Sequence, residues 1–185
     1  MSIDFRKAFG KEKASNCVEV SNEQIIKIYD FENQKCRIVK PNELKDKENL
    51  KTLEINNLLS KTICCVSVDN CLIDHKEQKC DCLIMEEDTT LVFVEMKTNA
   101  TSTSFETISD RLNDAKSQII STQTLIEGQI VELKSFKKRA LVCFRKDILT
   151  GSSMKSNSVS VNKFKRDFLK ENNFRIDISN KLSFA

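Results

Sequence analysis

The residues best suited to chemistry stand where an apolar stretch, Leu91–Val94, runs directly into Glu95 and Lys97. Burying a charge is costly unless the charge is paired or holds a metal, so charges at the end of an apolar strand need an explanation. Side chains alternate along a strand, which places Glu95 and Lys97 on one face. If the preceding run pairs with this strand as an antiparallel hairpin, Asp81 lies close to Glu95. The sequence therefore predicts two carboxylates and an ammonium group in one patch.

This patch is suited to a divalent metal. Mg²⁺ prefers oxygen ligands and is typically held by one or two carboxylates together with waters and substrate phosphate. A bound metal makes a bound water more acidic and neutralises charge on phosphate, and a neighbouring lysine such as Lys97 can orient or deprotonate that water. These are the requirements of phosphodiester hydrolysis, with Mg²⁺ as the expected cofactor and Mn²⁺ as a substitute.

The elements that must position these residues form a mixed α/β pattern of the α+β kind. Two apolar runs joined by an acidic turn predict the hairpin. A capped amphipathic helix follows, with Thr103 as its N-cap and Glu106 three positions later. The predicted core is a helix over 42–60, strands over 62–69, 79–86 and 89–97, a helix over 103–128 and a strand over 139–146. The predicted terminal additions are a hairpin over 23–31 and 35–40, a strand over 158–161, a helix over 163–172 and a strand over 174–179.

The chain of 185 residues is long enough for one domain with a real core, and no Pro-, Gly- or Ser-rich linker divides it. We expect a single domain over 1–185, with a core at about 42–146 and a basic extension over 147–185. No apolar run approaches the roughly 20 residues of a membrane span, and the N-terminus lacks the apolar segment of a secretory signal. A cytoplasmic location is expected.

Asp81 followed by Glu95-Met96-Lys97, between a leading and a following helix, resembles the PD-(D/E)xK nuclease superfamily over residues 42–146. The resemblance implies a restriction-endonuclease-like core of helix, three strands, helix and strand. It also implies a metal held by Asp81, Glu95 and the backbone carbonyl of Met96. Lys97 would serve catalysis.

Many members of this superfamily also carry a Glu on the leading helix and a Gln on the following helix. The candidates here are Glu54, as a further metal ligand, and Gln118, as a catalytic residue. Cys80 stands where the family has a proline before the Asp. Other E-x-K triplets occur at 77–79 and 132–134, but only the triplet at Glu95 ends an apolar strand and precedes a capped helix.

The formal charge of +3 conceals an asymmetry along the chain. From residue 133 onward there are 13 Lys and Arg against 4 Asp and Glu, whereas residues 1–132 carry 17 against 23. Such a basic third predicts a surface that faces a polyanion, with a merely solvated face as the alternative. The expected partner is nucleic acid, DNA rather than RNA because DNA is the commonest substrate in the family that the chain resembles. The residues expected to hold backbone phosphates are Lys134, Lys137, Lys138, Arg139, Arg145, Lys146, Lys163, Lys165 and Arg166.

Eight cysteines are present, and several lie within strand-like runs, where a reduced cysteine behaves as a small buried hydrophobe. Structural thiols are therefore expected. The alternative is a zinc site formed by Cys71, His75, Cys80 and Cys82, because sulfur and nitrogen ligands close in sequence suit tetrahedral Zn²⁺. Their spacing, C-x3-H-x4-C-x-C, matches no familiar zinc knuckle.

The favoured hypothesis is a Mg²⁺-dependent endonuclease, a phosphodiester hydrolase that acts in restriction, phage defence or repair. The alternative is a catalytically inactive module of the same fold that binds nucleic acid or a partner protein. A homodimer or a partner protein that supplies specificity would fit either hypothesis. With one histidine and no G-x-S-x-G motif, a hydrolase triad has little support, and no G-x-x-x-x-G-K-[ST] phosphate loop occurs.

Overall fold

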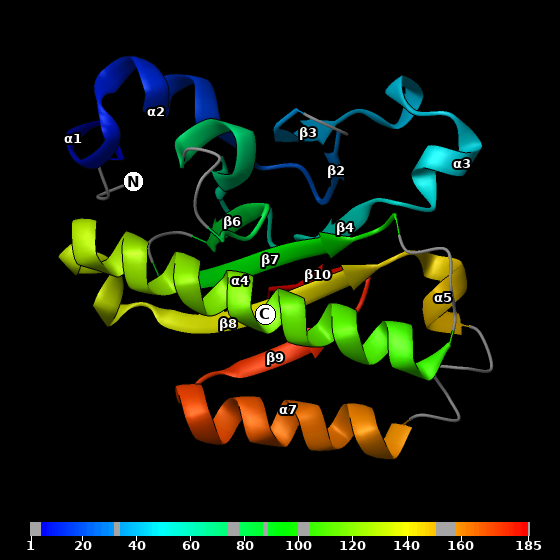
Figure 1. Ribbon diagram of the computed structural model, residues 1–185. Coiled ribbons are helices and arrows are strands. Elements are labelled where there is room, and N and C mark those ends of the chain that lie inside the picture. Colours follow the sequence, from blue (N-terminus) through cyan, green and yellow to red (C-terminus); the bar gives the residue numbers. More distant parts are fainter. Residues whose placement is uncertain are drawn as a thin grey trace.

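The computed structural model describes residues 5–31, 34–73, 78–86, 89–99, 104–150 and 158–184, and it has a mixed α+β fold built on two sheets (Figure 1). Within these residues the larger sheet has six strands, in the order β1-β5-β6-β7-β8-β9. The smaller sheet has four, in the order β10-β4-β2-β3. The larger sheet consists of β1 (Val18–Ser21), β5 (Ile63–Ser67), β6 (Cys82–Glu86), β7 (Thr90–Lys97), β8 (Lys137–Phe144) and β9 (Arg175–Ile178). The smaller sheet consists of β2 (Ile25–Asp30), β3 (Cys36–Val39), β4 (Leu53–Asn56) and β10 (Lys181–Ser183).

The centre of the larger sheet follows the predicted order of three strands, helix and strand. Strands β5, β6 and β7 pair antiparallel in succession, and β8 then pairs with β7 in parallel. A parallel pair needs a long crossover connection, which is supplied by α4 (Phe105–Gln129) and the short 3-10 helix η3 (Val131–Ser135). Figure 1 shows α4 lying along the face of β7 and β8.

Strand β7 is almost continuously apolar because both of its faces are covered. Leu91 and Phe93 belong to the core beneath α4, whereas Val92 and Val94 belong to the core between the two sheets. Parallel strands that are buried on both faces show such runs instead of strict alternation. Each fully buried side chain of this size stabilises the fold by about 1.5–3 kcal/mol, so the strand is held firmly up to Glu95.

The predicted helix over 42–60 is wrong. This stretch holds the 3-10 turn η1 (Pro41–Glu43), the one-turn helix α3 (Asp46–Asn49) and strand β4. Leu53 and Ile55 are fully buried in the core between the sheets, while the residues that alternate with them are half-buried. This alternation of buried and half-buried side chains is the pattern of a strand that packs on a core. The stretch forms a strand although its leucines are spaced as in a helix.

Two further boundaries differ from the prediction. The N-cap of α4 is Ser104, whose hydroxyl accepts a hydrogen bond from the Thr107 N–H at 3.3 Å, so the predicted cap is wrong by one position and Thr103 itself lies outside the described residues. The predicted strand over 158–161 is also wrong, because α7 (Ser158–Asn172) begins there. Val159 is exposed in its first turn, and the β-propensity of this stretch is outweighed by an amphipathic helix whose Phe168 is buried against the sheet.

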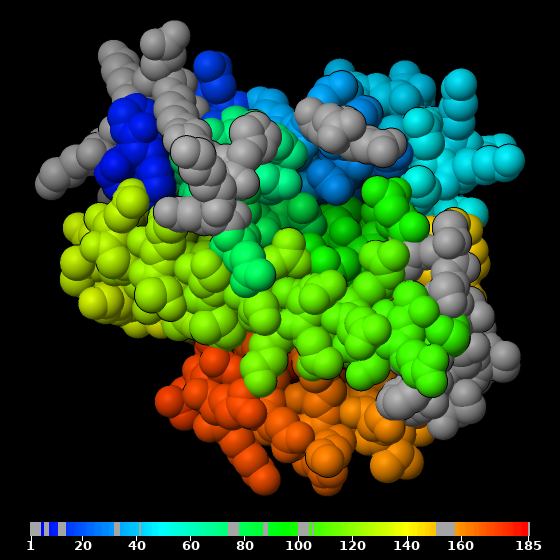
Figure 2. All heavy atoms as spheres, in the orientation of Figure 1, coloured from blue at the N-terminus to red at the C-terminus, as the bar shows by residue number. Residues whose placement is uncertain are grey.

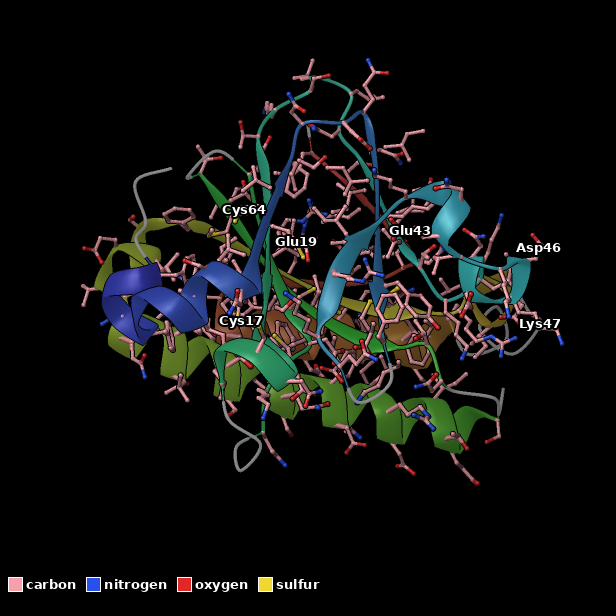
Figure 3. The ribbon with its side chains drawn as sticks, turned by 90° about the horizontal axis from the view of Figure 1, so that it is seen from above. Cys17, Glu19, Glu43, Asp46, Lys47 and Cys64 are labelled. Carbon is pink, nitrogen blue, oxygen red and sulfur yellow. A yellow bond between two sulfur atoms is a disulfide. The ribbon has the colours of Figure 1, made fainter. Side chains whose placement is uncertain are left out.

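The ends of the chain complete both layers. The N-terminal helices α1 (Phe5–Phe9) and α2 (Lys11–Cys17) lie at one end of the molecule and α3 at the other (Figure 3). Glu19 of β1 accepts a hydrogen bond from the Ile38 N–H of β3 at 3.0 Å and thereby joins the two sheets. The hairpin of β2 and β3 and the strand β9 are confirmed, whereas β1 and β10 were not predicted. The short helix α5 (Lys146–Thr150) follows β8.

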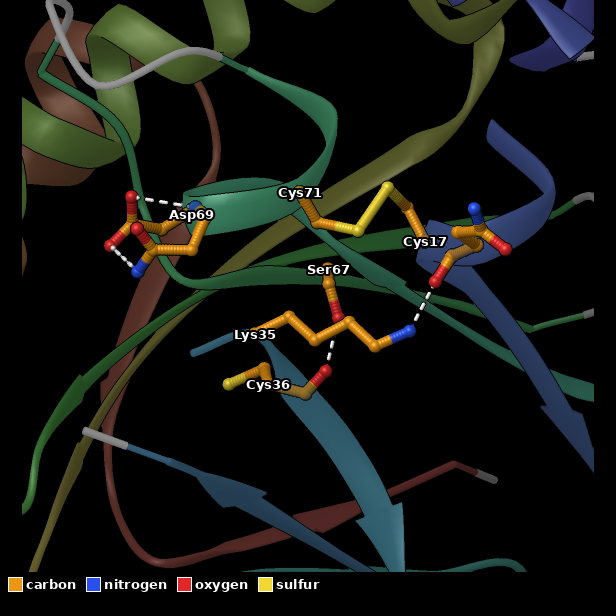
Figure 4. The surroundings of a disulfide bond; sticks show 8 residues. Cys17, Lys35, Cys36, Ser67, Asp69 and Cys71 are labelled. Carbon is orange, nitrogen blue, oxygen red and sulfur yellow. Dashed lines mark hydrogen bonds between the residues drawn. A yellow bond between two sulfur atoms is a disulfide. The ribbon is translucent and has the colours of Figure 1, made fainter. Parts of the chain in front are cut away.

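The expectation that the cysteines are free thiols is wrong for one pair. Cys17, at the end of α2, and Cys71, in the irregular segment η2 (Val68–Leu72), form a disulfide (Figure 4). The two residues are 54 positions apart, and only the tertiary fold brings them together. The other six cysteines are buried and lie outside any disulfide, as expected. Disulfides are typical of oxidising compartments, so this bond does not support the predicted cytoplasmic location. That location stays a prediction.

Candidate active site

The register of the β6–β7 hairpin brings Asp81 opposite Glu95. Cys82 pairs with Val94, and continuing the ladder by one residue places Asp81 across from Glu95. The Asp81 N–H donates to the Val94 carbonyl at 3.1 Å, and the Asp81 carboxylate accepts a hydrogen bond from the Met96 N–H. The predicted proximity of the two acids is therefore confirmed.

Lys97 connects the buried carboxylate to helix α4. Its ammonium lies 2.8 Å from Oε1 of Glu95 and donates at 2.8 Å to Oε1 of Gln118. Glu95 is only 3% exposed and the Lys97 side chain 13%, so the pair is largely removed from water. Gln118, the candidate that was predicted on the following helix, thus lies in the site.

Helix α4 also holds the segment that carries Asp81. The Gln118 amide donates to the Lys79 carbonyl at 3.2 Å, and the Thr122 hydroxyl, one turn later, accepts from the Cys80 N–H at 2.8 Å. Residues four apart lie on one face of a helix, so both bonds come from the same side of α4. Gln118 therefore positions both Lys97 and the approach to Asp81.

The surroundings of the two facing carboxylates disfavour their charged forms. Burial raises the pKa of Glu95 from 4.5 to about 7, against the opposing effect of Lys97. Burial and the neighbouring Glu95 also raise the pKa of Asp81 well above its usual value. Moreover, the buried Oε2 of Glu95 has no hydrogen-bond partner among the described residues. One ammonium does not neutralise this pair, and a buried unsatisfied carboxylate oxygen is expensive.

Two further acids near the site were not singled out from the sequence. Asp30 ends β2, and its pKa is raised to about 6 by burial and by Asp69. Asp69 lies in η2 and forms an ion pair with the buried Lys79 at 3.3 Å. Both acids contribute to the raised pKa of Glu95. A signal was present, because both Asp30 and Asp69 follow apolar runs, in the way that Glu95 follows Leu91–Val94.

Glu54, the other predicted metal ligand, is not in this site. It lies on β4 of the smaller sheet instead of on a helix, and its carboxylate is paired with Lys181 of β10 at 2.9 Å. The parallel pairing of β4 and β10 accounts for this contact. Of the predicted metal ligands, Asp81 and Glu95 face each other, and the Met96 N–H is bonded to the Asp81 carboxylate. Among the described residues, no group of three or more His, Cys, Asp or Glu side chains is arranged to hold a metal ion.

The alternative zinc site is not formed. The sulfur of Cys71 is bonded to Cys17 and is not available to a metal, and His75 lies outside the described residues. The sulfurs of Cys80 and Cys82 belong to different cores, one beneath α4 and one between the sheets. Cys80 precedes β6, which begins at Cys82, and the chain bends at Asp81 between them, so the two side chains do not lie on one face of a strand.

The basic residues proposed to hold phosphates fall into separate regions. Arg145 and Lys146 directly follow Phe144, which pairs with Lys97 in the parallel ladder, so they stand at the same end of the sheet as the carboxylates. Arg145 forms an ion pair with Asp147 at 2.5 Å. The others lie at the start of β8 and in η3 (Lys134, Lys137, Lys138 and Arg139) or on α7 (Lys163, Lys165 and Arg166).

Besides Arg145, two more of these predicted cations have acidic partners. Lys138 lies 3.2 Å from the carboxylate of Glu127, and Arg139 lies 3.1 Å from that of Asp177. Arg139 also donates to the Ser183 carbonyl at 3.1 Å, which ties β8 to the C-terminal segment. The positive charges of Lys138 and Arg139 are therefore partly neutralised by acidic residues of the same chain.

No protein-family model, curated protein or solved structure matches the chain. In the part of the chain that the structure describes, none of the helices combines the length and the apolar character needed to span a membrane.

Proposed function

We propose that this chain is a metal-dependent nuclease of the PD-(D/E)xK type with a restriction-endonuclease-like core. The observation that carries the proposal is the buried carboxylate of Glu95, which faces Asp81, keeps one oxygen unpartnered and is bound through the other to Lys97. A site whose acids are held at this electrostatic cost is a candidate for function instead of stability. The succession of β5, β6, β7, α4 and β8 supports the core assignment.

Asp81 and Glu95, with the backbone carbonyl of Met96, would hold one Mg²⁺ or Mn²⁺. The fit is chemical: Mg²⁺ prefers oxygen ligands, commonly takes only one or two carboxylates and completes its shell with water and phosphate oxygens. A bound divalent ion lowers the pKa of bound water and offsets the phosphate charge. The mutual repulsion of the two acids would be relieved by its charge.

Lys97 would act on the substrate, and Gln118 would hold Lys97 in position. The Lys97 ammonium is held between a carboxylate and an amide oxygen, so its position is fixed before any substrate arrives. A cation fixed in this way can stabilise negative charge that develops on a phosphate without reorganising at the moment of reaction. Arg145 and Lys146, at the same sheet end, would contact neighbouring phosphates of a DNA strand.

Single-turnover cleavage tests this proposal. Wild-type enzyme in excess over labelled DNA should cleave with Mg²⁺ or Mn²⁺ and be inactive in EDTA, and Asp81→Asn should abolish cleavage. Glu86→Gln is the matched control, because Glu86 is a buried carboxylate of the same hairpin that pairs with Lys61 at 2.5 Å, away from the site. Cleavage that is equally strong in EDTA, or equally strong in Asp81→Asn, would refute the proposal.

A second candidate is a non-catalytic module of the same fold that binds nucleic acid or a partner protein. It is favoured by one observation, namely that the described residues offer no group of three acidic, histidine or cysteine ligands for a metal. Such a module would bind DNA with or without EDTA. It would retain that binding in Asp81→Asn and never cleave.

A further inference from the structure

The disulfide between Cys17 and Cys71 ties an N-terminal helix to a segment that contacts the candidate active site. Cys17 ends α2, and Cys71 lies in η2, which directly follows β5. On the face shown in Figure 2, the N-terminal helices (blue) form one corner of the molecule, and η2 (blue-green) packs against α2. Figure 4 shows that Asp69 and Cys71 belong to this same short segment. The bond to Cys17 therefore also restrains Asp69.

Segment η2 is in turn bonded to the chain at Asp81. The Asp81 carbonyl accepts hydrogen bonds from the Val68 N–H at 2.9 Å and from the Asp69 N–H at 3.3 Å. The Asp69 carboxylate also pairs at 3.3 Å with Lys79, which precedes Asp81 by two residues. Helix α4 anchors the same stretch through the two hydrogen bonds described above. The position of Asp81 therefore depends on η2 as well as on α4.

The backbone of η2 is irregular and depends on these anchors. Asp69 and Asn70 have non-helical dihedral angles, and Asn70 adopts the left-handed region with φ of 56°. The Ile73 N–H closes the turn by donating to the Val68 carbonyl at 3.1 Å. Short segments without a regular ladder of hydrogen bonds open at low free energy. Because Val68 and Leu72 are buried in the core beneath α4, loss of the disulfide would loosen η2 without detaching it.

The disulfide can be reduced while the N-terminal helices stay attached. Cys71 is half-buried, whereas Cys17 is only 2% exposed, so an external thiolate reaches the bond from the side of Cys71. Phe5 of α1 and Ala14 of α2 are packed in the core beneath α4 independently of the disulfide. In the cytoplasm, the predicted location of this chain, disulfides are usually transient or redox-sensing. Accessibility and location thus both fit a reversible bond.

We propose that the disulfide between Cys17 and Cys71 is a redox switch for the candidate active site. The oxidised form holds Asp81 in its metal-binding position through η2, and the reduced form binds the metal more weakly. This inference rests on the proposed function, because it takes Asp81 as a metal ligand. Local bonds of this kind act as switches when they bias a segment that contacts a site.

A dithiol reductant converts one form into the other. One of its thiolates attacks the Cys71 sulfur, the S–S bond breaks, and Cys17 leaves as a thiolate that takes up a proton. The second thiol of the reductant then displaces Cys71, which is protonated in the same way. The protein gains two electrons and two protons, and the reductant ends as a disulfide.

Calorimetric titration of the full chain with Mn²⁺ tests the switch, on oxidised protein and on protein reduced by a dithiol that is then removed without air. Reduction should weaken Mn²⁺ binding about tenfold, a usual size for coupling between two sites. Cys17→Ser/Cys71→Ser should bind as the reduced wild type does, with or without the dithiol. Because coupling is reciprocal, saturating Mn²⁺ should shift the equilibrium with glutathione toward the disulfide by the same factor, which a purely structural disulfide would not do.

Phe5→Ala is the matched control, because it removes a buried side chain of α1 and keeps the disulfide, so Mn²⁺ affinity should be unchanged. In amide NMR without metal, reduction should shift Asp81 and Met96, whose N–H donates to the Asp81 carboxylate, and leave β8 unchanged.

Equal Mn²⁺ affinity of the oxidised and reduced protein would overturn the switch alone, and so would an equal loss of affinity in Phe5→Ala. Amide shifts of the same size throughout β8 would mean that the disulfide holds the whole fold, which also overturns the switch. Protein that binds no Mn²⁺ in either state would refute the proposed function and the switch with it.

Discussion

Replacing Glu95 by Gln should stabilise the metal-free protein at alkaline pH. The variant keeps the shape of the side chain but removes a charge that the folded state accommodates poorly. In the folded protein burial raises the pKa of Glu95 from 4.5 to about 7. Between these values the native state holds a proton that the unfolded state has released, so wild-type stability falls as the pH rises through this window.

The size of the effect follows from the same two pKa values. Their difference corresponds to about 3 kcal/mol of unfolding free energy, reached fully above pH 7 and absent below pH 4.5. For a chain of this length, that is a gain of about 6–12 °C in melting temperature at pH 8. Thermal and urea unfolding in EDTA at pH 5 and pH 8 measures it.

Two controls make this result specific. Glu132→Gln removes one exposed negative charge, and it should leave the pH dependence as in the wild type. Glu86→Gln removes a buried carboxylate together with its ion pair to Lys61, so it should destabilise. If Glu95→Gln is no more stable than the wild type at pH 8 in EDTA, the site carries no electrostatic cost and the reasoning from its burial is wrong.

The other predictions concern catalysis, binding and the disulfide. Lys97→Met keeps the aliphatic stem packed while removing the charge, so single-turnover cleavage should fall on the order of 10²-fold while DNA binding measured by anisotropy is retained; a rate near that of the wild type would exclude Lys97 from the chemistry. Lys137→Ser should flatten the salt dependence of DNA binding by about 0.9 if Lys137 contacts one phosphate, whereas an unchanged slope would return Lys137 to the solvated face. Cys17→Ser should lower the unfolding free energy by about 4 kcal/mol under oxidising conditions, because the bond to Cys71 closes a long loop. Reductant should destabilise the wild type and leave Cys17→Ser unaffected; equal responses would mean that the disulfide does not form.

The local part of the site was predictable because it depends on strand alternation. An apolar run ending in Glu95 and Lys97, with Asp81 at hairpin distance, has few ways to fold, and the register places these residues as expected. Gln118 was singled out only through the family resemblance, and its hydrogen bond with Lys97 was not predicted. Each of these inferences involves neighbours in sequence or a single crossover.

The errors that moved residues into or out of the site have a common physical cause, which is packing between distant segments. The stretch over 42–60 carries a leucine spacing that fits a helix, and only the smaller sheet selects strand β4 and removes Glu54 from the site. Asp30 influences the Asp81 and Glu95 carboxylates because the smaller sheet packs against the larger one. Likewise, the partner of Arg139 is Asp177, which lies 38 positions later in the chain.

The most direct test of the central claim is calorimetric titration of the apo protein with Mn²⁺ at pH 8. The account predicts one binding event in the wild type and loss of that event in both Asp81→Asn and Glu95→Gln, with Glu86→Gln binding as the wild type does. Circular dichroism of each variant should show that the fold is retained. Wild-type protein that binds no Mn²⁺, or Asp81 and Glu95 variants that bind it with wild-type affinity, would contradict the account.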